Sequence, residues 1–389
     1  MSSGSEEVGH RVVNSIQWSE ALPWWLLFRG AGAAFAPSVI LLASLGALAT
    51  WAGWSVTNNL GLVPESVTNS IPVEQAEVIP EDTQDLLKTD GLSLSARTLP
   101  ALQEGVKVLS TAGFDVVRLV SLPFMPSSSL SVAVGALIRL SWFVLVWSIF
   151  GTAISRHVAL SFVGEETPGL IGGLRYGSQK WLSSFSAVCF IFIGIIVLSI
   201  PGALLGLLMR MDIGLAIAGA VWPIVLLGAV VLAILVIGMV VAWPLMIATI
   251  GVEQGDSFQA ISTSFSYFYQ RPLHVAFYGF IAFVVALPVF AAAGVLAETT
   301  GTLALWAASF GMGHDRTVVV LDGIRECVSG QCGQPWGMQA IAFWTRGLEW
   351  LLGSFGWGYF WSIATAAYFL LRQDVDGTEL DEVVVDDVT

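Results

Sequence analysis

One block of sequence constrains the fold of this chain more than any other: residues 185–250, in which Arg210 and Asp212 are the only charged positions. A helix that crosses a bilayer needs about 20 mainly apolar residues, because the hydrocarbon core is ~30 Å thick. The block is long enough for two such crossings, and its two charges lie near its midpoint. It therefore predicts a helical hairpin with its turn at MRMDIG, residues 209–214.

The two arms of this hairpin are longer than the hydrocarbon requires. A helix accommodates such an excess by tilting, by breaking at a proline such as Pro201 or Pro223, or by extending beyond the bilayer. The sequence leaves these three alternatives open.

The composition of the whole chain places it in the membrane class. Apolar residues make up 55% of the sequence and charged residues only 12%, far from the balance of a soluble domain. We expect an all-α integral membrane protein with about six transmembrane helices in a single domain, residues 30–372. The predicted spans are about 34–56, 132–159, 185–209, 218–250, 273–296 and 350–371.

An even number of spans places both termini on one side of the membrane. The short loops on that side carry slightly more arginine and lysine than those opposite, which predicts cytoplasmic termini in a bacterial inner membrane. Residues 1–29 then form a cytoplasmic segment and an interfacial helix. The insertion 57–130 and the loop 300–340 lie outside, and the acidic tail 373–389 is expected to be disordered.

The cysteines bear on this topology. Cys327 and Cys332 lie in the outer loop, where oxidising conditions allow a disulfide that a reducing cytosol disfavours. The alternative is two unrelated thiols. Cys189 lies inside the third predicted span, where packing is its expected role.

The segment 251–272, GVEQGDSFQAISTSFSYFYQRP, separates two apolar blocks and has the pattern of an amphipathic helix. Asp256 with Gln259 three residues later indicates a helix N-terminus. The helix is too short and too polar to cross a bilayer, so we expect it to lie in the interface with its apolar stripe facing lipid. Four residues at 3-4-3 spacing form that stripe: Phe258, Ile261, Phe265 and Phe268.

A second copy of this segment precedes the third predicted span, and a fainter third copy covers residues 13–28. Because every copy precedes a span, we expect two or three parallel repeats, each an interfacial helix followed by a helical hairpin. The two clear copies share the motif Y-x-x-Q-[KR], as Tyr176, Gln179 and Lys180 and again as Tyr267, Gln270 and Arg271.

The copy at residues 251–272 also resembles known membrane domains. The pattern E-[GQ]-x-D-x-F-x-A-[IL]-x-x-S-[FW]-x-[YL] between two spans is matched by Glu253, Asp256, Phe258, Ala260, Ile261, Ser264, Phe265 and Tyr267. From about residue 140 onward, the chain resembles bacterial polytopic membrane proteins of planctomycete type. It is similar to the membrane domain of some glycerophosphodiester phosphodiesterases. That domain has no known activity and this chain has no soluble phosphodiesterase barrel, so the resemblance implies a membrane fold and no catalytic residues.

The sequence holds no recognised catalytic, cofactor or metal motif. The four histidines lack the spacing of a metal site, and no P-loop, G-x-S-x-G or dinucleotide fingerprint is present. The net charge of −13 argues against a nucleic-acid partner. We therefore expect no catalytic residue, cofactor or metal, and membrane lipids with other membrane subunits as partners.

Three charged residues within or beside predicted spans are weak candidates for transport, since charges in hydrocarbon are costly and often functional. Arg139 lies about one turn inside the second span, and Arg346 and Glu349 precede the sixth span at i, i+3 spacing. The alternative for Arg139 is a side chain that snorkels outward. The alternative for Arg346 and Glu349 is an ion pair that marks a helix end.

These observations predict a non-catalytic integral membrane protein that serves as an accessory, scaffold or complex-forming subunit. The alternative is a permease or lipid-handling channel for an apolar or weakly charged substrate, which needs no buried charge. A membrane-bound enzyme ranks third, because the predicted spans contain almost no ionisable groups.

Overall fold

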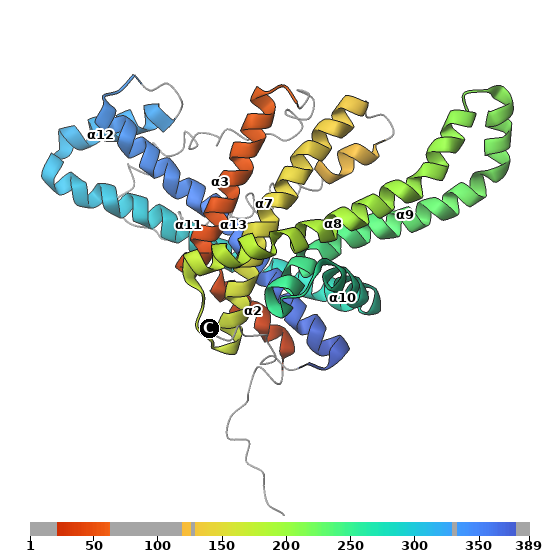
Figure 1. The fold of residues 1–389 in the computed structure, drawn as a ribbon. Helices are drawn as coiled ribbons and strands as arrows, with labels where there is room; N and C mark the ends of the chain where they lie inside the picture. The colour runs from red at the N-terminus through yellow and green to blue at the C-terminus, as the bar shows by residue number, and fades with distance from the viewer. Residues whose placement is uncertain (1–21, 63–118, 126–128, 329–332, 379–389) are drawn as a thin grey trace, which may run out of the picture.

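The structure is a computed structural model that describes residues 22–62, 119–125, 129–328 and 333–378 (Figure 1). Within these ranges the chain forms helices and turns and contains no strand. In chain order the elements are η1 (Pro23–Trp25), α2 (Leu26–Ala33), α3 (Pro37–Asn59), η2 (Leu122–Phe124), α7 (Leu130–Val163), α8 (Gly169–Leu208), α9 (Asp212–Glu253), α10 (Ser257–Gln270), α11 (Pro272–Met312), α12 (His314–Val328) and α13 (Trp336–Asp376).

Five of these helices, α3, α7, α8, α9 and α11, are long and apolar enough to cross a membrane. The fold class is therefore all-α, with the helices of a membrane protein. The sixth predicted span, 350–371, lies in α13, which is not among the five described helices that meet this standard. The five tryptophans and five glycines of α13 lower its mean hydropathy. The count of six spans stays a prediction.

The helices cross at an aromatic core. α7 contacts α3, α8, α9 and α13, and Trp147 of α7 and Trp361 of α13 are completely buried. The ring of Trp147 lies 4.7 Å from that of Trp357. The ring of Trp361 meets Trp243 of α9 edge-on at 5.3 Å. Aromatic pairs of this kind add ~0.5–1.5 kcal/mol beyond the burial of their surface, so the rings join α7, α9 and α13 at one point.

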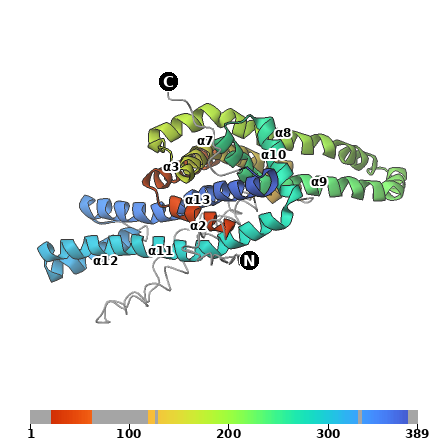
Figure 2. The ribbon, with the colours of Figure 1, turned by 90° about the horizontal axis from the view of Figure 1, so that it is seen from below.

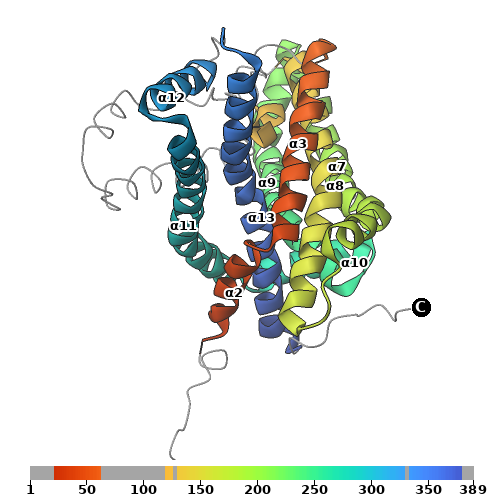
Figure 3. The ribbon, with the colours of Figure 1, turned by 90° about the vertical axis from the view of Figure 1, so that its left-hand side faces the viewer.

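Away from this crossing the helices spread apart in a fan (Figure 1). α8 and α9 stay side by side as one long arm, while α11, α12 and α13 lie on the opposite side (Figure 2). Seen from the side, α3, α7 and α13 run in about the same direction (Figure 3). The outer part of the α8–α9 arm exposes large apolar side chains such as Ile213, Ile224 and Leu227. A helix that is apolar on all its faces is stable in contact with hydrocarbon, as expected for a membrane-spanning arm.

Glycines allow the helices to approach closely where they cross. A Cβ atom on Gly177 of α8 would lie 2.2 Å from the carbonyl oxygen of Ile149 in α7. A Cβ on Gly251 of α9 would lie 2.7 Å from the Cβ of Ser155 in α7, and α3 approaches α7 in the same way at Gly53. Small residues at helix crossings are typical of membrane proteins, where close van der Waals contact holds helices together.

The hairpin of α8 and α9 turns at residues 209–211, within the MRMDIG segment where the sequence predicts it. α8 continues through Pro201 and α9 continues through Pro223, so neither proline ends its helix. The arm leans away from α7 (Figure 1). Of the three alternatives for the long arms, a break of the helix is therefore wrong.

Two helices begin or end at places that the sequence did not indicate. α8 begins at Gly169, so the copy of the motif that contains Tyr176 is the first part of a long helix rather than a separate interfacial helix. α11 continues to Met312 and α12 follows it, so most of the predicted outer loop 300–340 is helical. A helix satisfies its backbone hydrogen bonds internally, so it can pass from a polar to an apolar stretch without interruption.

Candidate functional site

The densest polar network among the described residues surrounds the end of α9. α9 ends at Glu253, followed by Gln254 in the left-handed conformation with φ 58°. The side chain of Asp256 then accepts a hydrogen bond of 2.8 Å from the backbone N–H of Gln259, and α10 begins at Ser257. The helix and its cap occur where the sequence predicts them. Because the structure contains no membrane, the interfacial location of α10 stays a prediction.

The stripe predicted to face lipid is not the face that α10 buries. Ser257, Ala260, Ser264 and Tyr267 are its buried residues, whereas Phe258 is 65% exposed. Ile261 and Phe265 of the stripe are also partly buried, since they pack against apolar residues of α8 and α9. Phe258 is therefore the one stripe residue that is largely exposed, and the prediction that the whole stripe faces lipid is not confirmed.

Three side chains bind the carbonyl oxygens at the end of α9. The hydroxyl of Tyr176 donates to Ile250 at 2.7 Å, the ammonium of Lys180 donates to Gln254 at 2.6 Å, and Arg156 donates to the carbonyl of Gly251 at 3.5 Å. The last carbonyls of a helix have no partner within the helix and carry partial negative charge, which favours cations. The end of α9 is thus held by α7 and α8.

Glu253 joins three helices. One carboxylate oxygen accepts a hydrogen bond from the hydroxyl of Tyr368 in α13 and lies 3.4 Å from Nε of Arg372. The other accepts a hydrogen bond of 2.7 Å from the side-chain amide of Gln259 in α10. The carboxylate is mostly buried, with 17% of the side chain exposed. A buried carboxylate needs such partners because burial without them is costly.

The end of α13 is held by two tyrosines. The hydroxyl of Tyr267 in α10 donates to Asp376, and the hydroxyl of Tyr278 in α11 donates to Asp374 at 2.6 Å. Burial, together with the hydrogen bond to Asp376 and its negative charge, raises the pKa of Tyr267 well above its usual value. The hydroxyl therefore keeps its proton and donates a hydrogen bond to the carboxylate of Asp376.

The two copies of the repeated motif make different contacts. Tyr176 and Lys180 bind α9, whereas Tyr267 binds α13. Gln179 is exposed on α8, the amide of Gln270 donates to the hydroxyl of Ser266 at 2.6 Å, and the exposed Arg271 ends α10. The likeness of the copies therefore lies in their helical pattern and not in a shared set of contacts.

The structure places the remaining candidates in helix–helix contacts. Arg139 is 3% exposed and donates to the side-chain carbonyl oxygen of Asn58 at 2.5 Å, with its guanidinium 5.7 Å from the ring centroid of Trp54. α3 thus supplies Arg139 with an acceptor near its last residue and with an aromatic face. Outward snorkelling of this side chain stays a prediction. Arg346 donates to the carbonyl of Cys327 at 2.8 Å.

Two of the predicted residues lie outside what the structure describes. The side chain of Glu349 is one, so its pairing with Arg346 stays a prediction. Cys327 is disulfide-bonded, but Cys332 lies outside the described residues, so the pairing of these two cysteines also stays a prediction. Cys189 is a free thiol.

The sequence analysis missed several residues of the network at the end of α9. Tyr368, Arg372 and Asp376 follow i, i+4, i+8 spacing and lie on one face of α13. That spacing of polar residues at the end of an apolar helix is a signal that could have indicated the network. Arg156 lies near the end of the second predicted span, and nothing in the local sequence indicates that it meets α9.

Comparisons with known proteins return no match: no family model, curated protein or solved structure is similar to this chain. The resemblance to the membrane domain of glycerophosphodiester phosphodiesterases stays a prediction.

Proposed function

We propose that this protein is a non-catalytic component of a bacterial inner membrane and serves as an accessory, scaffold or complex-forming subunit. One observation carries the proposal: buried and partly buried charged side chains among the described residues join helices. Lys180 binds a carbonyl of α9, Arg139 binds α3, and Glu253 joins α9, α10 and α13. Charges bound in this way hold helices in position relative to one another.

The pair of side chains closest in type to a catalytic nucleophile and base is Ser38 and His157. The hydroxyl of Ser38 lies 3.2 Å from Nε2 of His157, which is almost fully buried. Nucleophilic catalysis also needs a third group that orients the base. Among the described residues, no hydrogen bond reaches Nδ1 of His157. The contact therefore supports a tie between α3 and α7 better than a catalytic dyad.

The centre of the bundle supports a scaffold better than a permease. Trp147 and Trp361 are completely buried where α7 and α13 cross, and their rings touch at a centroid distance of 5.8 Å. A substrate could pass through this point only if the two rings separated, and the loss of their packing would cost free energy. A permease that moves its substrate elsewhere along the bundle is the alternative function.

Copurification from native membranes tests the proposal. The chain would be extracted in a lipid-retaining polymer and its partners quantified by mass spectrometry. We expect a stoichiometric membrane partner. Leu227→Trp on the exposed α8–α9 arm should weaken the association if the arm is the contact, and Leu48→Trp on the exposed face of α3 is the matched control. Recovery of the chain alone, at a single monomer mass, contradicts the proposal.

A serine-reactive fluorophosphonate probe tests the non-catalytic part separately. Its expected outcome is the same background labelling in the unchanged protein and in Ser38→Ala. Labelling that is lost in Ser38→Ala and in His157→Gln would show an activated nucleophile and establish an enzyme.

A further inference from the structure

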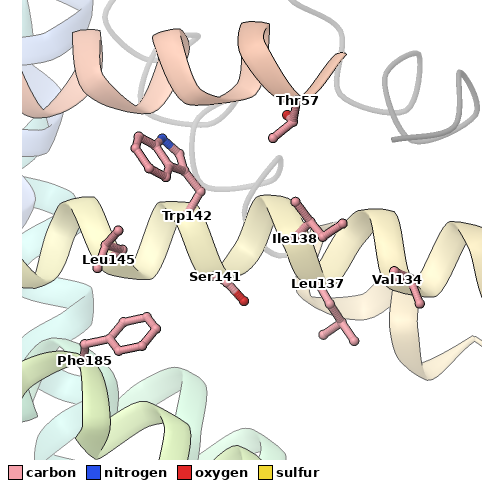
Figure 4. Close-up of a pocket in the computed structure, with 8 residues that line it drawn as sticks. All are labelled: Thr57, Val134, Leu137, Ile138, Ser141, Trp142, Leu145 and Phe185. Atoms are coloured by element: carbon pink, nitrogen blue, oxygen red, sulfur yellow. The ribbon is translucent and has the colours of Figure 1, made fainter. Parts of the chain in front are cut away.

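A groove of about 450 Å³ lies on the flank of the bundle between α3, α7 and α8 (Figure 4). This volume falls within the ~300–1,000 Å³ typical of small-molecule sites. α3 contributes Thr57, α8 contributes Phe185, and α7 contributes the rest: Val134, Leu137, Ile138, Ser141, Trp142 and Leu145.

The groove follows α7 for about half the thickness of a bilayer. Its α7 residues recur at three- and four-residue spacing and so form one stripe. From Val134 to Leu145 this stripe rises about 16 Å, whereas one leaflet of hydrocarbon is ~15 Å deep. One end of the groove lies near the last residue of α3, Asn59, and near the first of α7, Leu130. With a membrane boundary placed at that end, the groove would reach about the midplane, and Phe185 of α8 lies beside Leu145 at its far end (Figure 4).

The lining offers an occupant mainly apolar groups, because two of its polar groups are already hydrogen-bonded within the protein. The hydroxyl of Thr57 donates to the carbonyl of Trp54 at 2.9 Å, and the indole N–H of Trp142 donates to the carbonyl of Ala49 at 3.0 Å. Both donors are thus bound within the protein. An occupant meets methyl, methylene and aromatic groups, and the exposed hydroxyl of Ser141.

The shape of the lining favours a hydrocarbon chain over another helix. The helix crossings described above occur at glycines such as Gly53, Gly177 and Gly251, because a helix needs small residues to approach closely. The eight residues of the groove include no glycine or alanine, and six of them are large apolar or aromatic residues; Thr57 and Ser141 are the two small ones. A flexible chain one methylene wide fits between such side chains, whereas a helix ~10 Å across needs a wider opening.

We propose that this groove is a lipid site that holds one acyl chain of a phospholipid from the leaflet next to the Asn59 end of α3. The chain lies along α7 from Val134 to Leu145, and the headgroup stays at the boundary where α3 ends and α7 begins. This site goes beyond the complex-forming role and does not depend on it.

Photocrosslinking tests the site. The full chain would be reconstituted in phosphatidylethanolamine vesicles that contain a phospholipid with a diazirine on its acyl chain, and adducts would be mapped by mass spectrometry. Ile224 of α9 is 70% exposed and lies on the apolar arm away from the groove, so residues around it report ordinary lipid contact. We expect adducts on residues 134–145 at about tenfold the yield per residue seen around Ile224.

A matched pair of variants distinguishes a specific lipid site from the general contact of exposed residues with lipid. Ser141→Trp fills the groove and should lower the yield on residues 134–145 about tenfold. Ser199→Trp, on an exposed serine of α8 outside the groove, should leave that yield unchanged. Equal yields at the groove and around Ile224 in the unchanged protein overturn the proposal whether or not a variant folds.

Discussion

The hydroxyl of Tyr176 in α8 lies 2.7 Å from the carbonyl oxygen of Ile250 in α9 and donates a hydrogen bond to it. The ring of Tyr176 also faces the guanidinium of Arg156, whose Cζ lies 5.3 Å from the ring centroid. Arg156 in turn reaches the carbonyl of Gly251. Tyr176, which belongs to one copy of the motif, is thus bound to α9, the helix that leads into the copy with Tyr267. Arg156 of α7 contacts both Tyr176 and the end of α9.

Removal of the Tyr176 hydroxyl should destabilise the protein by about 1 kcal/mol, because the carbonyl of Ile250 then loses a donor in a partly buried place. Tyr176→Phe tests this in mixed detergent micelles, with unfolding followed by circular dichroism. Tyr269→Phe is the control, since its hydroxyl binds the carbonyl of Ile234 at 2.8 Å from an exposed side chain. An equal loss in the two variants would refute a special role for Tyr176.

Gly177 should tolerate no side chain. A Cβ at this position would lie 2.2 Å from the carbonyl oxygen of Ile149, which belongs to the backbone of α7 and cannot move aside cheaply. We expect Gly177→Ala to lower the free energy of unfolding by about 2 kcal/mol or more. Gly194→Ala in the same helix meets nothing within 4 Å and should be neutral or slightly stabilising.

Loss of the Glu253 carboxylate should destabilise the ends of α9, α10 and α13 together. Glu253→Ala removes the acceptor of Tyr368 and Gln259 and the partner of Arg372, and we expect a loss of about 2–3 kcal/mol. Glu253→Gln keeps an acceptor and should lose less. Glu165→Ala removes the same charge at an exposed turn and should change stability little. Amide hydrogen exchange in α10 reports the local effect.

High pH should lower the stability that the contact between Tyr267 and Asp376 provides. The folded protein raises the pKa of Tyr267 above the usual value near 10, so this group binds its proton more tightly when folded. Its contribution to stability is complete below about pH 10 and is lost as pH rises toward the raised pKa. The loss of stability between about pH 9 and 11 should therefore be smaller in Tyr267→Phe than in the unchanged protein. An identical pH profile in Tyr267→Phe is the contrary result.

Features that depend on neighbouring residues could be predicted from the sequence. The turn between α8 and α9 falls at the only charges of a long apolar block, and Asp256 caps α10 through a hydrogen bond to Gln259, three residues later. The lengths of α8 and α11 could not be predicted in the same way. Membrane thickness suggests where a span must end, but a helix continues for as long as its own backbone is satisfied.

The candidate site could be predicted only in part. Tyr176, Lys180 and Tyr267 stand out as a repeated motif, yet the repeat indicates nothing about their partners, Ile250, Gln254 and Asp376. Glu253 and Tyr368 are far apart in the chain and meet only because α13 packs against α9. Hydrogen-bond partners that are so far apart in the sequence are determined by how the helices cross.

The sequence by itself determined the class of this protein, since long apolar blocks can satisfy their backbone in hydrocarbon only as helices. It also determined the hairpin turn and the cap of α10, which follow from local charge and local hydrogen bonding. Only the tertiary structure decided that Trp147 and Trp361 meet at the centre, that Arg139 turns toward α3, and that a groove opens along α7. Apolar faces at the same spacing can pack in many ways, and the glycines that let two backbones touch select one of them.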